Sequence, residues 1–239
     1  MNFESFAESP PNLHCWDGTW CTGGFETYHL RAIYDFCRQN LVSHPNIIET
    51  GAGNSTICFL HLQPSRLVSI APEKDLFERV DFYCCANGIS TEPIQRYIDG
   101  SEWVLPELGK AARSVEPDFD LALIDGIHNW PTSMIDFFYI NFMLKNGSFL
   151  MIDDIQLHSV AELVRFISYD TVNFRLRADF GKLQIFQKIT DQRQLGEWIT
   201  HPYIRRMSGR RLARLTNYFA KVIIKARDIH DKLPDWARR

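Results

Sequence analysis

The sequence lacks any apolar run long enough to cross a bilayer. Charged or turn-forming residues interrupt every hydrophobic stretch well before the roughly 20 residues that a membrane-spanning helix needs. The N-terminal residues also lack the basic start and the apolar core of a secretory signal peptide. We therefore expect a protein without a membrane span that resides in the cytoplasm.

The cysteines lack the spacing that marks a zinc site or a disulfide framework. None of the six forms a Cys-x-x-Cys pair or a Cys/His ligand pattern, and most of them stand in apolar helical patterns. A reduced thiol in such a pattern behaves as a small hydrophobic side chain. We therefore expect neither disulfide bonds nor structural zinc.

Charge is unevenly distributed, although the net charge is only −3. Residues 203–239 hold eleven Lys and Arg but three Asp and Glu, which is a local charge of +8 and leaves −11 on the first 202 residues. We interpret residues 191–239 as a basic helical extension. Its apolar residues recur at spacings of three and four and predict one apolar seam: Leu212, Leu215, Phe219, Val222, Ala226 and Ile229.

Two uses of this extension are open. A seam with a three-four repeat is typical of a contact between copies or domains, so we expect a homo-oligomer formed through the C-terminal helix. The alternative is a nucleic-acid or membrane partner bound through the arginines. We disfavour that alternative because the acidic remainder of the chain would oppose docking on a polyanion.

The central part of the chain reads as an α/β domain. With 239 residues, of which 45% are hydrophobic, the chain can bury a full core. Residues 45–190 alternate β-rich and amphipathic helical runs, which predicts a parallel sheet. Strands are expected at 46–50, 66–70, 94–98, 119–125 and 148–153, helices at 54–62, 74–87, 102–113, 130–145 and 157–168, and a closing antiparallel hairpin at 173–180 and 182–189.

Two local features complete this organisation. Asn146-Gly147 is interpreted as a helix stop before the last parallel strand. Residues 1–44 contain one helical pattern, Glu26–Gln39, and we interpret this segment as a lid over a cofactor site. The equal alternative is a plain N-terminal helix that completes the core.

A glycine loop follows the first predicted strand, in Glu49-Thr-Gly-Ala-Gly-Asn-Ser-Thr56. Glycines between a strand and a helix let the backbone come close to a ligand. The third glycine of a dinucleotide-binding loop is absent, since Asn54, Ser55 and Thr56 stand in its place. Glu49 would repel a pyrophosphate but suits an ammonium group, so the loop favours a cationic or zwitterionic cofactor.

A second pair of motifs brings acids to neighbouring strand ends: Ile124-Asp-Gly-Ile-His128 and Met151-Ile-Asp-Asp154. The carboxyl ends of parallel strands meet at one edge of a sheet, so these side chains should lie near the glycine loop. Carboxylates this close repel one another unless a cation neutralises them or one is protonated, and all-oxygen ligands favour Mg²⁺, Ca²⁺ or Mn²⁺. Alternatively, Asp125 contacts the cofactor and Asp153 or Asp154 caps the next helix.

The glycine loop resembles motif I, E/D-x-G-x-G, of class I S-adenosylmethionine-dependent methyltransferases. This resemblance implies a Rossmann-like fold, with a mostly parallel seven-stranded sheet that ends in an antiparallel hairpin, and S-adenosyl-L-methionine as cofactor. The family's ribose-binding acid is replaced by Ala71, with Glu73 two residues later. The cofactor contacts that the resemblance implies are Glu49, Gly51, Gly53, Ser55, Glu73, Ser101 and Asp125.

The second pair of motifs resembles a narrower group, the metal-dependent small-molecule O-methyltransferases related to the macrocin-type sugar enzymes. That resemblance implies a divalent metal, Mg²⁺ above all, held by Asp125, Asp153 and Asp154, with His128 as general base. The implied acceptor is a hydroxylated small molecule such as a sugar, glycoside or catechol. The alternatives are a metal-independent methyltransferase and an inactive protein of this fold that uses its basic C-terminal helix to bind a partner.

Overall fold

The computed structural model describes residues 1–193 together with 200–207, 218–219, 222–223 and 225. The chain divides into two compact units, Met1–Gln194 and Leu195–Arg239. Helix α8 (Pro202–Met207) belongs to the second unit, whereas most of the predicted apolar seam and its oligomer contact lie outside the described residues. Within the described ranges, no helix is both long and apolar enough to cross a membrane.

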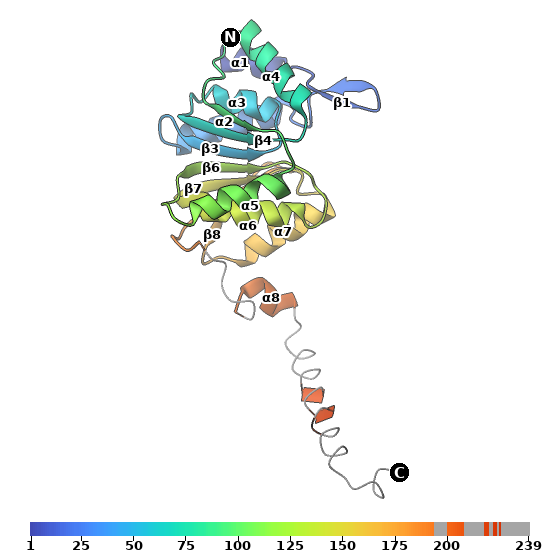
Figure 1. Ribbon diagram of the computed structural model, residues 1–239, viewed down its shortest axis with the longest axis vertical. Helices are drawn as coiled ribbons and strands as arrows, with labels where there is room; N and C mark the ends of the chain where they lie inside the picture. Colours follow the sequence, from blue (N-terminus) through green and yellow to red (C-terminus); the bar gives the residue numbers. More distant parts are fainter. Residues whose placement is uncertain (194–199, 208–217, 220–221, 224, 226–239) are drawn as a thin grey trace, which may run out of the picture. The chain divides into compact units, whose positions relative to one another are not determined.

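A seven-stranded sheet forms the centre of the first unit (Figure 1). Its spatial order is β5-β4-β3-β6-β7-β9-β8, with β9 antiparallel to both of its neighbours and the other pairs parallel. The strands are β3 (Asn46–Thr50), β4 (Arg66–Ile70), β5 (Ile94–Tyr97), β6 (Phe119–Ile124), β7 (Leu144–Ile152), β8 (Phe174–Asp179) and β9 (Gln184–Lys188). The predicted fold class is therefore confirmed, and the strand order reverses between β3 and β6, where open α/β sheets bind their ligands.

Helices cover both faces of this sheet. They are α1 (Phe3–Glu8), α2 (Thr27–Asn40), α3 (Asn54–Leu60), α4 (Lys74–Ala86), α5 (Ser101–Ala112), α6 (Thr132–Met143) and α7 (His158–Tyr169). Each helix from α1 through α4 contacts the next one, and the same holds from α5 through α7. Figure 1 shows α5, α6 and α7 together. Successive side chains of a strand alternate between the faces, so Leu121 and Leu123 of β6 enter the core cluster with α2, α3 and α4, whereas Ala122 and Ile124 do not.

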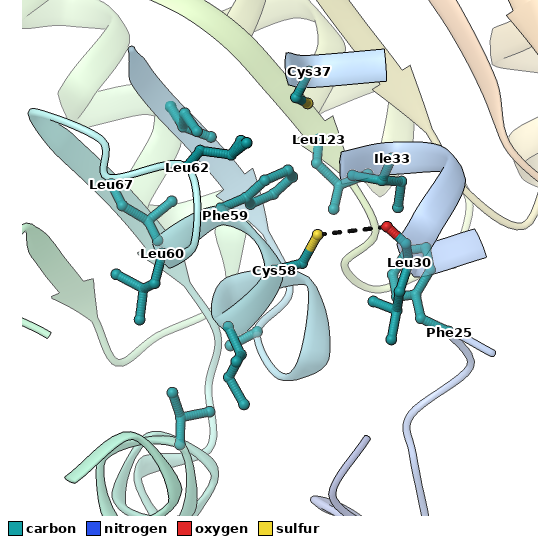
Figure 2. Close-up of a cluster of buried hydrophobic side chains, with 14 of the residues drawn as sticks. Phe25, Leu30, Ile33, Cys37, Cys58, Phe59, Leu60, Leu62, Leu67 and Leu123 are labelled. Atoms are coloured by element: carbon teal, nitrogen blue, oxygen red, sulfur yellow. Dashed lines mark hydrogen bonds between the residues drawn. The ribbon is translucent and has the colours of Figure 1, made fainter. Parts of the chain in front are cut away.

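Helix α2 completes the core on its face of the sheet. Figure 2 shows its Leu30 and Ile33 packed close to Cys58 of α3, whose thiol donates a hydrogen bond to the Leu30 carbonyl with an S···O distance of 3.7 Å. Burial raises the pKa of the Cys37 and Cys58 thiols, so both stay protonated and pack as small apolar groups. For this helix the geometry is that of a core element.

Three local details differ from the sequence-based expectation. Helix α1 (Phe3–Glu8) was not predicted, since residues 1–44 were expected to contain one helix only. A hairpin of β1 (His14–Trp16) and β2 (Thr19–Cys21) precedes α2 and was not predicted. The helix stop at Asn146-Gly147 is wrong, because α6 ends at Met143 and both residues lie within β7. The buried ammonium of Lys188, on β9, donates hydrogen bonds to the carbonyls of Asn141 and Leu144. A side chain distant in the sequence therefore supplies the donors for the last carbonyls of α6, which need no glycine cap.

Candidate active site

A cavity of about 550 Å³ opens at the edge of the sheet where its parallel strands end. Its lining comes from the segments that follow β3, β4, β5, β6 and β7, together with part of the N-terminal hairpin region. Six of the predicted site residues line it: Gly51, Glu73, Ser101, Asp125, His128 and Asp154. The other four, Glu49, Gly53, Ser55 and Asp153, are not among the lining residues.

The two sequence motifs meet at Gly51. Its backbone has a φ of +92°, and its N–H donates to the carbonyl of Ile70 at 2.8 Å. A Cβ atom on Gly51 would lie 2.4 Å from the carbonyl oxygen of Asp125, whose own N–H donates to the Thr50 carbonyl at 3.0 Å. Only glycine combines this φ with so close an approach of another backbone. The glycine loop and the acidic loop are therefore held together by main-chain contact.

Glu49 lies beneath the glycine loop and is fully buried. Its carboxylate accepts hydrogen bonds from the hydroxyls of Ser55 (2.8 Å), Thr56 (2.6 Å) and Ser69 (2.7 Å). Burial raises the pKa of Glu49 to about 7, against the opposing effect of these three hydroxyl donors. The geometry gives Glu49 and Ser55 the role of bracing the loop, and their direct contact with a cofactor stays a prediction.

His14 of β1 lies over the other glycine of the loop. A Cβ atom on Gly53 would lie 2.7 Å from Nε2 of His14, and one on Gly23 would overlap the same ring. Burial lowers the pKa of His14 and favours the neutral imidazole. His14, Trp16, Gly23 and Gly24 all line the cavity. The sequence analysis did not identify His14, and its only indication was the predicted lid, which as a moving element stays a prediction.

Arg79 of α4 anchors this hairpin region. Its Nε donates to the Leu13 carbonyl at 2.8 Å, and its guanidinium lies 5.1 Å from the centre of the Trp20 ring. The same guanidinium is 3.9 Å from Glu73, the candidate for the ribose hydroxyls. Ala71, where the family usually has its acid, also lines the cavity. Glu73 therefore lines the cavity, but its carboxylate also forms an ion pair with Arg79, which anchors the hairpin region.

Three side chains converge at the ends of β6 and β7. Nε2 of His128 lies 3.8 Å from Oδ1 of Asp125 and 3.7 Å from Oδ2 of Asp154. One ligand atom from each of the three falls within 4.8 Å of the others. Asp154 has a φ of +53°, a left-handed conformation that is uncommon outside glycine and marks a site where the fold holds a side chain in place.

Asp153 has a different partner. Its side chain is almost fully buried, and Oδ2 accepts a hydrogen bond from the ammonium of Lys182 at 2.6 Å. The same ammonium lies 3.4 Å from Oδ1 of Asp154. The structure thus groups His128, rather than Asp153, with Asp125 and Asp154, and the assignment of Asp153 as a metal ligand stays a prediction. The sequence analysis missed Lys182.

The electrostatics of this cluster are dominated by burial and by Lys182. Burial, followed by the charge of Asp153, raises the pKa of Asp125 far above its usual range, while Lys182 opposes this. Burial alone would lower the pKa of Lys182, but its hydrogen bond to Asp153 and the charges of the three carboxylates outweigh that effect and raise it. Lys182 is therefore a permanent cation that offsets part of the negative charge.

The donor set fits the divalent metal that the resemblance implies. Asp125 and Asp154 offer carboxylate oxygens toward one point, and Mg²⁺ in proteins is commonly held by one or two carboxylates together with water. Among the described residues, Nε2 of His128 and Oδ1 of Asp153 have no hydrogen-bond partner although both atoms are buried. Polar atoms of this kind are usually satisfied, so the cluster has capacity for a ligand or ion.

Comparison with known proteins gives a fold but no family. No protein-family model and no curated protein matches the chain. Solved structures do match: a methyltransferase from Geobacter sulfurreducens (14% identity, TM-score 0.52, covering 67% of this chain and 78% of that one) and an rRNA methylase from Streptococcus thermophilus (18%, 0.50, 66% and 95%). The MycE methyltransferase of the mycinamycin biosynthetic pathway, in complex with Mg and SAH, is also similar (13%, 0.50, 73% and 53%).

These identities are low, so the likeness shows the fold alone. The chain has the Rossmann-like fold of the class I S-adenosylmethionine-dependent methyltransferases, as predicted. One neighbour is described as an rRNA methylase and another as a methyltransferase of mycinamycin biosynthesis, and the likeness does not choose an acceptor for this chain.

We expect Gly51→Ala to lower the free energy of unfolding by at least ~2 kcal/mol. The substitution combines a strained positive φ with a 2.4 Å contact to the Asp125 backbone, which cannot move without breaking the strand ends. Gly88→Ala is the matched control, because Gly88 has a φ of +67° but open space around its Cβ position, and it should cost only about 1 kcal/mol. Urea denaturation measures both, and equal losses would contradict the close approach.

We expect Glu49→Gln to become increasingly favourable as pH rises. The folded pKa of about 7 exceeds the ordinary 4.5, so folding retains the proton and wild-type stability falls as pH rises from 4.5 to 7. Glutamine cannot ionise, so the stability of the variant relative to wild type should rise by up to ~3 kcal/mol between pH 5 and pH 8. Urea denaturation at both pH values measures this, with Glu92→Gln on the surface as the control, and a pH-independent difference would refute it.

Proposed function

We propose that the protein is an S-adenosylmethionine-dependent methyltransferase that methylates an oxygen of a hydroxylated small molecule, assisted by a divalent metal. The observation that carries this proposal is the junction at Gly51, which brings the glycine loop and the Asp125/His128/Asp154 cluster to one cavity. A cofactor loop alone would indicate only a nucleotide-binding fold. Beside a base and two acids, it supports a group-transfer enzyme.

The cofactor site is proposed on the side of the cavity lined by the glycine loop. Gly51 and Ala52 line the cavity there, and Glu73 and Ser101 line it after the ends of β4 and β5. The resemblance assigns the amino-acid part of the cofactor to the glycine loop and its nucleoside to the next two strand ends. The cavity volume is in the range of small-molecule sites, which supports a low-molecular-weight acceptor.

The residues that act on the acceptor are proposed in separate roles. An alcohol must lose its proton as it attacks a methyl group, and a histidine that titrates near neutrality can accept that proton. His128 lines the cavity, and its Nε2 has no hydrogen-bond partner and lies 3.7–3.8 Å from carboxylate oxygens of Asp125 and Asp154, which supports a role in accepting that proton. When bound by Asp125 and Asp154, with Asp153 as the further predicted ligand, a divalent ion would acidify and orient the acceptor hydroxyl.

A second candidate is a methyltransferase that works without a metal. It is favoured by one observation, the Lys182 ammonium at hydrogen-bonding distance from Asp153 and Asp154. A cation supplied by the chain already neutralises part of this cluster. The two candidates differ in one measurable property, since a chelator should abolish turnover in the first and leave it unchanged in the second.

We expect calorimetry to detect S-adenosylmethionine binding to the wild-type protein. Asp125→Ala should weaken binding about tenfold or more, because Asp125 lines the cavity next to the glycine loop and is one of the predicted cofactor contacts. Glu92→Gln is the control, because Glu92 is exposed and is not among the residues that line the cavity. If the wild-type protein does not bind S-adenosylmethionine at millimolar concentration, the proposed function is wrong.

We expect His128→Gln to lower kcat by about 100-fold or more, since a positioned general base contributes roughly that factor. The cofactor Kd should stay the same, because the proposed role concerns the acceptor proton. Turnover is measured with radiolabelled cofactor and an acceptor found among pooled catechols, glycosides and phenols. His158→Gln, on the exposed start of α7, is the matched histidine control. Unchanged kcat in His128→Gln would exclude His128 as the base.

A further inference from the structure

Lys182 is held at the acidic edge of the sheet by the register of its neighbours. It lies in the turn between β8 and β9, and the antiparallel register pairs Gln184 of β9 with Ile152 at the end of β7. The carbonyl of Lys182 accepts a hydrogen bond from the N–H of Ile155 at 3.0 Å. The main chain of Lys182 is therefore bound to the segment that carries Asp153 and Asp154.

The ammonium of Lys182 is also fixed from two sides. Toward the strand ends it lies 2.6 Å from Oδ2 of Asp153 and 3.4 Å from Oδ1 of Asp154. On another side it lies 4.7 Å from the centre of the buried Phe25 ring, a cation–π contact, and close to Gly24. The side chain is only 19% exposed. This is a positioned internal cation and not a surface lysine that happens to reach an acid.

A positioned ammonium and a divalent ion compete for the same oxygens. Two cations within a few ångströms repel strongly when partly buried, and the ammonium already occupies one oxygen of Asp153 and one of Asp154. Oδ2 of Asp154 faces His128 instead, and the nearby Asp125 carboxylate is not bonded to Lys182. Oδ1 of Asp153 is buried without a hydrogen-bond partner, but Asp153 is not grouped with the ligand atoms of Asp125, His128 and Asp154, and its bond to the ammonium is the shorter one. Lys182 therefore divides the three carboxylates unequally.

We propose that Lys182 is a built-in counter-ion that withholds Asp153 from the metal site and weakens the affinity of that site for divalent cations. With Lys182 in place, Asp125 and Asp154 are the carboxylate ligands. This inference deepens the proposed function and rests on its metal site. It makes Lys182 the residue that sets how tightly the metal is held, and it predicts that Asp153 becomes a ligand only when the ammonium is removed.

The test is a Mn²⁺ titration followed by electron paramagnetic resonance and calorimetry on the full chain. Lys182→Met should tighten Mn²⁺ binding about tenfold or more, because it removes a positive charge and frees Asp153. Lys182→Arg keeps the charge and should show no such gain. In the wild-type background, Asp153→Asn should weaken Mn²⁺ binding through the lost charge alone, whereas Asp154→Asn removes a ligand as well and should weaken it clearly more, by about tenfold or more. Asparagine tolerates the left-handed backbone of Asp154, so that variant changes the charge and keeps the conformation.

The double variant Lys182→Met/Asp153→Asn completes a thermodynamic cycle. In the Lys182→Met background, Asp153→Asn should reverse most of the gain, because Asp153 is then a ligand. The proposal is overturned if Lys182→Met leaves Mn²⁺ affinity unchanged or lowers it, if Asp153→Asn and Asp154→Asn weaken wild-type binding equally, or if no variant binds Mn²⁺.

Lys182→Met leaves a buried carboxylate without its partner, so this variant could fail to fold. The double variant removes both charges and keeps the proposal testable in that case. Because Lys182 also bonds Asp154, the double variant should still bind Mn²⁺ more tightly than Asp153→Asn alone. Equal affinities would overturn the proposal.

A parallel titration with S-adenosylmethionine separates this inference from the proposed function. Cofactor binding without Mn²⁺ affinity in any variant overturns the counter-ion and leaves the methyltransferase assignment standing. If Lys182→Met binds Mn²⁺ more tightly but no variant binds the cofactor, the role of Lys182 as a counter-ion is supported and the proposed function is overturned.

Discussion

The main-chain contact between Gly51 and Asp125 is the constraint on which the candidate site depends. Parallel strands β3 and β6 lie next to each other where the strand order reverses, and their continuations touch only because Gly51 has no side chain. Glu49 braces the loop from below through three hydroxyls. The glycine loop and the acidic cluster thereby share one cavity, which is the observation that supports the proposed group-transfer reaction.

Charge balance is the second constraint. Asp125, Asp153 and Asp154 crowd the ends of two strands, and burial makes their mutual repulsion costly. One fixed ammonium, on Lys182, offsets part of this negative charge. The imidazole of His128 faces Asp125 and Asp154. A divalent ion would complete the neutralisation on that side. In the proposed function, the metal and the base would occupy neighbouring parts of this one cluster.

Much of the fold was predictable because its cause is local. The alternation of strand and helix patterns predicted the five parallel strands of the sheet, and a short turn at Gly181 predicted the two strands of the closing hairpin. The rule that parallel strands end at one edge correctly placed Asp125 and Asp154 at the cavity. The β1/β2 hairpin and the end of α6 were not predicted, because tertiary contacts from Arg79 and Lys188 hold them.

The sequence by itself determined the sheet, its edge and the residue types that gather there, since hydrophobic periodicity and glycine placement act over a few residues. Only the tertiary structure decided how those side chains are partnered. Lys182 reaches Asp153 from 29 residues away because the register of β7 and β9 brings the turn beside that strand end. His14 reaches the glycine loop from the N-terminal hairpin. Such pairings depend on distances between strands that no local pattern encodes, and they set the charge of the site.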